Sequence, residues 1–265
     1  MSEKAEISVI TIFRNEEKHI EETIHSLLHQ DFQNFECILV DGHSEDRSYE
    51  IAESLIRGDA RFHLIRQISY GISNAFNEGL AASEADYLMF LNAGDSLSDA
   101  QSLGKAASLC RLHSGEIIAF RSEYMNESGK LMGKFFPEHT PCFEKLPWYC
   151  SLSHQATLVP AEFFRKTGGY LPVMKIAMDY ELWLRAMKSG YRLHASDVVI
   201  AHHRIGGVSF SQLSLSRKEV ILARIFHLGF FRLSLLKDLV QLFLIFWGTI
   251  RESRQGRASV VSGDI

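Results

Sequence analysis

The sequence predicts an α/β fold: a doubly wound, mostly parallel sheet, followed by a looser second half and by helices at the C-terminal end. Two observations carry this prediction. Apolar runs of strand length alternate with stretches of helical periodicity up to Leu91, and polar residues follow each run where a strand would end. Strands that alternate with helices join through right-handed crossovers and form parallel sheets.

The first elements show the alternation most clearly. Residues 7–13 (ISVITIF) are β-branched and apolar on both faces, which is typical of a strand buried within a parallel sheet. Ile20, Ile24 and Leu27 then share one face of a helix that Asn15 is expected to cap. Further strands are predicted at 35–40, 62–65 and 87–91, with helices at 49–57 and 73–83.

After Asp95 the periodicity becomes less regular. Helices are predicted at 103–112 and 180–189, and short strands at 117–120 and 198–201, while 161–167 is predicted to be ordered without an assigned type. Two helices follow, at 213–228 and 233–250. The second is strongly apolar but contains Lys237 and Asp238, so it falls short of a bilayer span. It is predicted either to rest on a membrane surface or to pack as a core or oligomer contact.

Composition narrows the class of protein. The 265 residues carry a net charge of -4, which disfavours a nucleic-acid partner because phosphate binding needs a clustered basic face. The four cysteines show no C-x-x-C spacing, which favours a reducing compartment and no structural zinc. The N-terminal residues do not read as a signal peptide. The expectation is a cytoplasmic protein, with 233–250 as its candidate contact with the inner membrane face.

Carboxylates gather where the predicted strands end. Ligands of open α/β sheets bind outside the carboxyl ends of the strands. There the chain carries FRNE after the first strand, DGHSED after the second and NAGD after the fourth. Neither G-x-G-x-x-G nor a P-loop lysine is present. Such acids suit a nucleotide whose diphosphate is neutralised by Mg²⁺ or Mn²⁺.

These segments also carry a family resemblance. SVITIFRNEE, ILVDGHSED, YGISNAFNEG and LMFLNAGD are similar, in order and register, to successive motifs of bacterial family 2 glycosyltransferases. Downstream, SHQATLVPAEFFRKTGGY, AMDYELWLRAMKSGY and GGVS resemble the acceptor-side half of transferases that build exopolysaccharide repeat units, such as colanic acid transferases. The resemblance spans about 7–209.

The resemblance implies a GT-A fold and a hexosyltransferase-like enzyme that inverts the anomeric carbon. The donor would be a nucleotide-diphospho-sugar, and the acceptor a glycan or lipid-linked glycan in the synthesis of bacterial surface polysaccharide. The transferase domain would cover 1–210, divided into a nucleotide-binding half (1–98) and an acceptor half (99–210). Residues 211–265 would form a helical, membrane-associating segment.

The resemblance also assigns roles to individual residues. Asp41 resembles the acid that contacts the nucleoside base, and Asp95 resembles the last acid of a D-x-D motif that binds Mn²⁺ or Mg²⁺. Asp179 resembles the general base, and its place at a helix start favours the charged carboxylate. The other residues assigned to the nucleotide-sugar are Thr11, Phe13, Glu16, Ser44, Gly71, Asn77 and Asn92. Asn92, Ala93 and Gly94 leave a single carboxylate in the metal motif, and Ser69 and Asn74 replace residues that are often acidic in the family.

Alternatives stay open for several residues. Asp41, Asp95 and Asp179 stand where an Asp also serves as a cap or turn residue. His202 or His203 would either contact the metal or the diphosphate, or have a structural role. His154 and Gln155 would either orient the acceptor or pack a loop. A non-catalytic sugar-nucleotide-binding or scaffold protein is the alternative function. A nucleotidyltransferase is disfavoured, because the chain lacks a Gly-rich basic loop.

Overall fold

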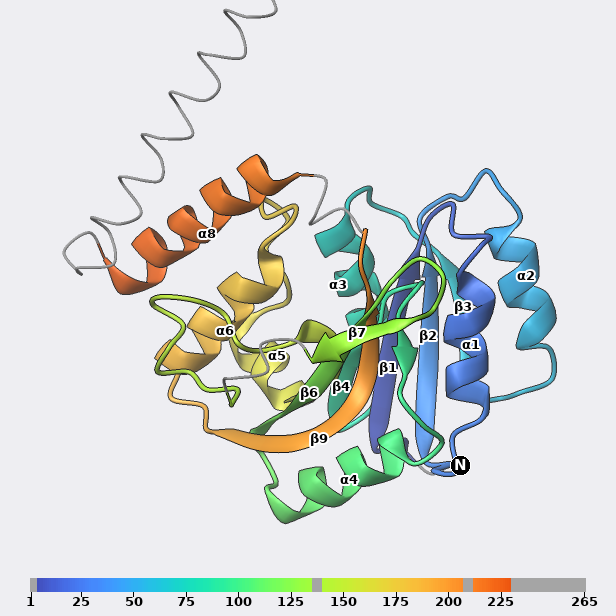
Figure 1. Cartoon of the computed structure of the whole chain (residues 1–265), viewed down its shortest axis with the longest axis horizontal. Helices are drawn as coiled ribbons and strands as arrows, with labels where there is room; N and C mark the ends of the chain where they lie inside the picture. Colours follow the sequence, from blue (N-terminus) through green and yellow to red (C-terminus); the bar gives the residue numbers. More distant parts are fainter. Residues whose placement is uncertain (1–3, 135–139, 207–211, 230–265) are drawn as a thin grey trace, which may run out of the picture.

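The computed structural model describes residues 4–134, 140–206 and 212–229. Its first half is the predicted parallel sheet, in the order β3-β2-β1-β4. The strands are β1 (Ile7–Phe13), β2 (Phe35–Asp41), β3 (Phe62–Arg66) and β4 (Tyr87–Phe90), and the helices between them are α1 (Ile20–Leu28), α2 (Ser48–Leu55) and α3 (Ile72–Ala82) (Figure 1). The α/β class expected from the sequence is confirmed.

The second half continues the sheet with mixed strand directions. Beyond β4 the order is β8 (Thr157–Pro160), β6 (Ile117–Met125), β9 (Leu193–Arg204) and β5 (Ser96–Leu97), while β7 (Leu131–Lys134) pairs with β6. Strands β6 and β9 run parallel, and β8 is antiparallel to β4 and to β6. Both β6 and β9 are longer than predicted, because their polar residues pair across the sheet and hide the apolar signal.

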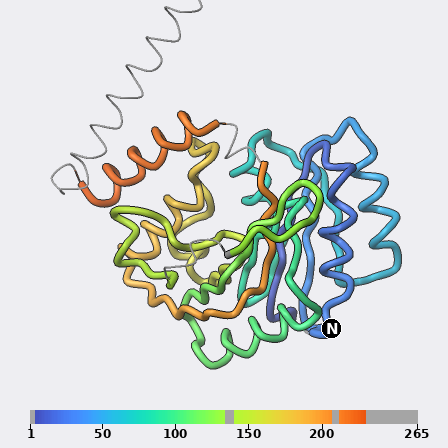
Figure 2. Tube along the Cα trace, viewed as in Figure 1, coloured from blue at the N-terminus to red at the C-terminus, as the bar shows by residue number. Residues whose placement is uncertain are grey.

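Helices cover both faces of the sheet. On one face, α1, α2 and α4 (Ser102–Leu112) bury Ile24, Ala52 and Leu103. On the other, α3, α5 (Ala161–Thr167) and α6 (Met178–Lys188) bury a second core around Phe76 and Trp183. Helix α8 (Leu213–Leu228) packs on α6 at one end of the molecule, as Figures 1 and 2 show. The carboxyl ends of β1 and β2 stay open between these layers.

The predicted cap of α1 is wrong. The helix begins at Ile20 with His19 at its N-cap position, and no side chain caps it. Asn15 instead adopts a left-handed conformation with φ 57°. Its Oδ1 accepts the Glu45 N–H at 2.8 Å, and its own N–H donates to Ser44 Oγ at 3.0 Å. Asn15 therefore ties the loop after β1 to the loop after β2.

Within the part of the chain that the structure describes, no helix combines the length and apolar character needed to cross a bilayer. The predicted helix 233–250 lies outside the described residues, so its contact with a membrane stays a prediction.

Candidate active site

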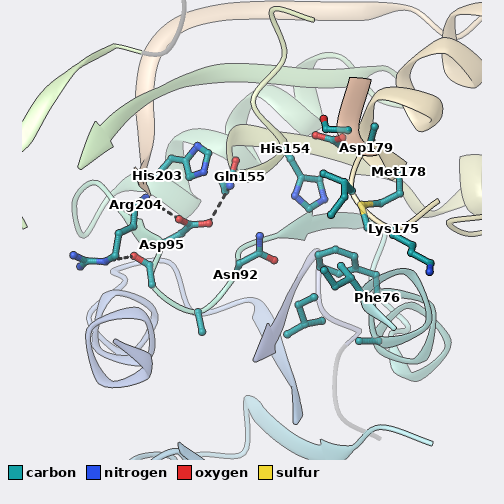
Figure 3. A pocket seen from close by; sticks show the side chains of 18 of the residues that line it. Phe76, Asn92, Asp95, His154, Gln155, Lys175, Met178, Asp179, His203 and Arg204 are labelled. Carbon is teal, nitrogen blue, oxygen red and sulfur yellow. Dashed lines mark hydrogen bonds between the residues drawn. The ribbon is translucent and has the colours of Figure 1, made fainter. Parts of the chain in front are cut away.

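A cavity of about 880 Å³ lies where the two halves of the sheet meet. Phe13 lines it from the end of β1, and Glu16 and Asn92 line it from the loops after β1 and β4. The 3-10 helix η1 (His154–Ala156), the start of α6 and the end of β9 supply the opposite wall. Figure 3 shows Asp95 and Asp179 on different sides of this space. The carboxyl ends of the central strands thus form the site, as open α/β sheets require.

The acid at the end of β2 has an unused oxygen. Asp41 is fully buried beside Gly42, which lines the cavity. Its Oδ1 accepts the Ser44 N–H at 3.0 Å, whereas its Oδ2 has no hydrogen-bond partner among the described residues. Asn92 Oδ1 is likewise buried without a described partner. Because unpaired buried acceptors are costly, both atoms are suited to donors of a bound ligand.

Asp41 itself does not line the cavity, and three other predicted donor-side residues also lie outside the lining. Thr11 lies fully buried within the sheet, and Ser44 accepts the Asn15 N–H. Asn77 binds the backbone N–H and C=O of Tyr170, at 2.7 and 2.8 Å. The Ser44 and Asn77 side chains therefore stabilise segments next to the cavity through hydrogen bonds. Gly71 does line the cavity, at the start of α3 with φ 113°.

Asp95 is held from two directions. Its Oδ1 accepts the backbone N–H of Arg204 at 2.9 Å, and its Oδ2 accepts Gln155 Nε2 at 3.0 Å (Figure 3). Burial raises the pKa of Asp95 above its ordinary value, while His203, Arg204 and Gln155 act in the opposite direction. In this structure the Gln155 amide therefore positions the Asp95 carboxylate. Each carboxylate oxygen keeps a second lone pair for a cation.

Strand parity decides which histidine reaches the site. His203 lines the cavity and lies near enough to Asp95 and Asp179 to lower the pKa of both. His202, the other candidate, stands outside the lining and pairs with Ser96 across β5 and β9. Successive side chains of a strand point to opposite faces. His203 is thus the histidine that can reach a metal or a diphosphate.

Three carboxylates line the cavity near the end of β1. Burial, followed by the charges of Asp46, Asp95 and Glu127, raises the pKa of Glu16. Glu16, Asp95 and Glu127 all line the cavity. Oxygen donors of this kind fit Mg²⁺ or Mn²⁺, and a divalent cation would relieve their mutual repulsion. The types of residue present therefore fit the predicted metal, and Asp95 would be its principal ligand.

Asp179 stands in the first turn of α6 and lines the cavity. Its Oδ1 accepts the Tyr180 N–H at 2.7 Å. The helix start favours the charged form of this acid, but burial is the largest influence and raises the pKa of Asp179. The effect of burial on this pKa is larger than the opposing effects of the N–H groups and of His203. A carboxylate with a raised pKa is a better proton acceptor.

His154 is a packing residue in this structure. It is 8% exposed, and its Nε2 lies 2.9 Å from the Tyr170 hydroxyl. Its ring stacks on Phe90 at 5.3 Å. Burial lowers the pKa of His154 to about 3, so the ring is neutral at physiological pH. It shapes the cavity wall rather than moving protons.

Helix α8 holds the segment that leads to Asp179. Glu219, only 4% exposed, accepts the backbone N–H groups of Lys175, Ile176 and Ala177 at 2.8 to 2.9 Å. Residues 175–179 all line the cavity. One buried carboxylate therefore fixes the wall on which Asp179 stands.

Replacing Glu219 with alanine should leave three N–H groups without their acceptor. Hydrogen bonds to charged groups contribute about 1.5–3 kcal/mol each, so a stability loss of about 3 kcal/mol or more is expected. Urea unfolding measures it. The exposed neighbour Lys218, changed to alanine, is the control. Equal stability of the Glu219 variant and wild type would contradict this role.

Several lining residues were not predicted from the sequence. Glu127 follows β6, whose predicted end at 120 left it in a turn far from the site. A predicted strand that continued to residue 125 would have placed Glu127 at the same end of the sheet as the site. Lys175 and Arg204 also line the cavity, and the Arg204 guanidinium holds the loop after β4 through the Gly94 carbonyl at 3.0 Å.

Known proteins resemble this chain in sequence. Residues 8–132 match the model of Glycosyl transferase family 2. The uncharacterized glycosyltransferase EpsJ of Bacillus subtilis (strain 168) is 42% identical over 94 residues, which make up 36% of this chain and 27% of that relative. The chain thus matches about a quarter of EpsJ. The putative teichuronic acid biosynthesis glycosyltransferase TuaG of the same strain is 26% identical over 209 residues, 77% of this chain and 81% of TuaG.

Solved structures resemble it in fold. S. aureus TarS 1-349 in complex with UDP-GlcNAc aligns with a TM-score of 0.66 and 18% identity, over 83% of this chain and 66% of that one. The mannosyltransferase PcManGT from Pyrobaculum calidifontis, in complex with GDP-Man and Mn²⁺, aligns with a TM-score of 0.66 and 14% identity, over 100% of this chain and 77% of its own. Residues 8–132 thus form a glycosyltransferase family 2 domain, and the chain has a GT-A fold.

Proposed function

We propose that this protein is an inverting glycosyltransferase that moves a sugar from a nucleotide-diphospho-sugar to a glycan or lipid-linked glycan in the synthesis of a bacterial surface polysaccharide. The observation that carries the proposal is one cavity in which Asp95 and Asp179 stand on different sides. The relatives support it: TuaG is named for teichuronic acid biosynthesis, and TarS and PcManGT were solved with nucleotide-sugars. Residues 1–98 would bind the nucleotide and 99–210 the acceptor.

The proposed reaction is a single displacement. The acceptor hydroxyl oxygen forms the new bond to the anomeric carbon, the bond from that carbon to the diphosphate oxygen breaks, and the hydroxyl proton passes to a carboxylate oxygen of Asp179. Asp41 Oδ2, beside the lining residue Gly42, would accept a donor of the base, and Asp95, with Glu16 and Glu127 nearby, would hold the divalent cation. That cation, when bound, supplies positive charge to the departing diphosphate.

A ligand screen tests the donor side. UDP-, GDP-, dTDP- and CMP-linked sugars are added with and without Mn²⁺, and the melting temperature is measured, since a ligand selective for the folded state raises it. We expect one nucleotide class to raise the melting temperature only with Mn²⁺. No response to any of them would favour a scaffold protein on the same fold.

The raised pKa of Asp179 predicts the pH dependence of transfer. A protonated Asp179 cannot accept the hydroxyl proton, so kcat at saturating donor and metal should fall as the pH drops through this pKa. Because burial raises the value, the loss should begin above the pH where an ordinary Asp, with a pKa of about 3.9, is protonated. Measuring kcat from about pH 4.5 to about pH 8 tests this. A rate that stays constant across this range would contradict it.

A further inference from the structure

A second cluster of metal-ligand side chains lies at the end of the sheet opposite the cavity. His113 follows α4, Glu116 precedes β6, and His194 belongs to β9 beside Ile118. Strands β6 and β9 run parallel, so the three residues gather at the amino ends of this pair. Figure 1 shows the end of α4 and the start of β6 there, away from the ends of β1 and β2 that open on the cavity. None of the three lines that cavity.

The ligand atoms are already close. One nitrogen from each histidine and one carboxylate oxygen of Glu116 all lie within 4.8 Å of one another. The two imidazole rings are stacked, with 3.6 Å between centroids and 21° between planes. His113 Nδ1 lies 3.7 Å from Glu116 Oε2. All three side chains are partly buried, which limits the freedom that an ion would have to remove.

Neighbouring groups orient the ligands. Arg192 pairs with Glu116 Oε1 at 2.8 Å, while the other oxygen faces His113. The Glu116 N–H donates to the His113 carbonyl at 3.0 Å, and the Gly115 N–H donates to the Tyr87 hydroxyl at 2.8 Å. In metal sites, groups that do not touch the ion typically hold its ligand side chains in place, and losing such a group lowers metal affinity about 10–100-fold. The turn is therefore held in place without an ion.

We propose that His113, Glu116 and His194 bind a divalent transition-metal ion of the zinc class. Imidazole nitrogens favour Zn²⁺, Ni²⁺ or Cu²⁺, whereas Mg²⁺ and Mn²⁺ favour oxygen ligands such as those around Asp95. Two histidines and a carboxylate leave the fourth position of zinc for water. The stacked rings must open by rotation at χ2, a broad torsion in histidine. The ion would join the end of α4 to β9.

Zinc titration of the whole protein in excess Mg²⁺ tests the site, because Mg²⁺ competes at the oxygen ligands of the cavity. We expect one Zn²⁺ per chain and a melting temperature that rises by several degrees at about 100 times the dissociation constant. His113→Ala and His194→Ala should each weaken binding at least about 10-fold. The conservative change Glu116→Gln should also weaken it, which keeps the test usable if a histidine variant fails to fold.

Two control variants separate this site from other zinc ligands. His25 of α1 and His29, which directly follows this helix, have ring centroids 5.7 Å apart, and Glu21 is 3.5 Å from His25. Changing both histidines to alanine, or Asp95 to alanine, should leave the zinc affinity unchanged. The proposal is wrong if zinc binds equally to wild type and the His194 variant, or if binding disappears with His25 and His29. It does not depend on the proposed transfer reaction.

Discussion

Replacing Asp179 with asparagine should lower transfer by about 10²–10⁴-fold, the usual contribution of a positioned proton acceptor. The amide oxygen can still accept the Tyr180 N–H, so the start of α6 should keep its geometry. Donor binding should persist, because Asp95 lies on the other side of the cavity. Product formation from the nucleotide-sugar measures the first effect, and the metal-dependent rise in melting temperature measures the second. Retained transfer would remove Asp179 as the base.

The same variant should be more stable than wild type at neutral pH. A folded-state pKa above the unfolded value means that the stabilising effect of protonation is complete below the unfolded pKa and is lost as the pH rises through the folded one. Asparagine does not ionise, so the variant does not lose this stability as the pH rises. The melting temperature should therefore be higher than that of wild type near neutral pH and converge with it in acid. A less active but more stable variant would exclude misfolding as the cause of lost transfer.

The first half of the fold was predictable because its signals are local. Strands such as 7–13 are apolar on both faces, and the rule that ligands bind at the carboxyl ends of strands placed Asp95 and Glu16 at the cavity. Strands β6 and β9 were underestimated, since residues such as Arg121 and Glu123 pair along the sheet yet look like loop residues. Because the predicted strand ended at residue 120, Glu127 was not recognised as a residue of the site.

Partners from distant parts of the chain were not predictable. Asp95 is held by Gln155 and Arg204, which are 60 and 109 residues away in sequence. Motif spacing carries no information about such contacts. The choice between His202 and His203 also required the register of β9 against its neighbours. For Asp179, the helix start was recognised, but the burial that dominates its pKa depends on the packed wall around it.

Replacing Asp95 with alanine should abolish the metal-dependent part of donor binding. The cation would lose its proposed principal ligand, while the proposed base contact near Asp41 would remain. A bound metal contributes several kcal/mol to stabilising the departing charge, so transfer should fall by about 10³-fold or more. Calorimetric titration of Mn²⁺ and nucleotide measures the binding. The exposed Glu53 of α2, changed to alanine, is the matched control for loss of one acid.

Gln155→Ala separates the position of Asp95 from its charge. This change removes the amide that donates to Asp95 Oδ2 but leaves the carboxylate and its bond from the Arg204 N–H. Metal affinity should fall by about 10–100-fold, less than for Asp95→Ala, because partners of a ligand orient it without binding the ion. If both variants lose metal-dependent binding equally, Gln155 contacts the donor or the ion directly. If the Gln155 variant behaves as wild type, Arg204 alone is sufficient to position the carboxylate.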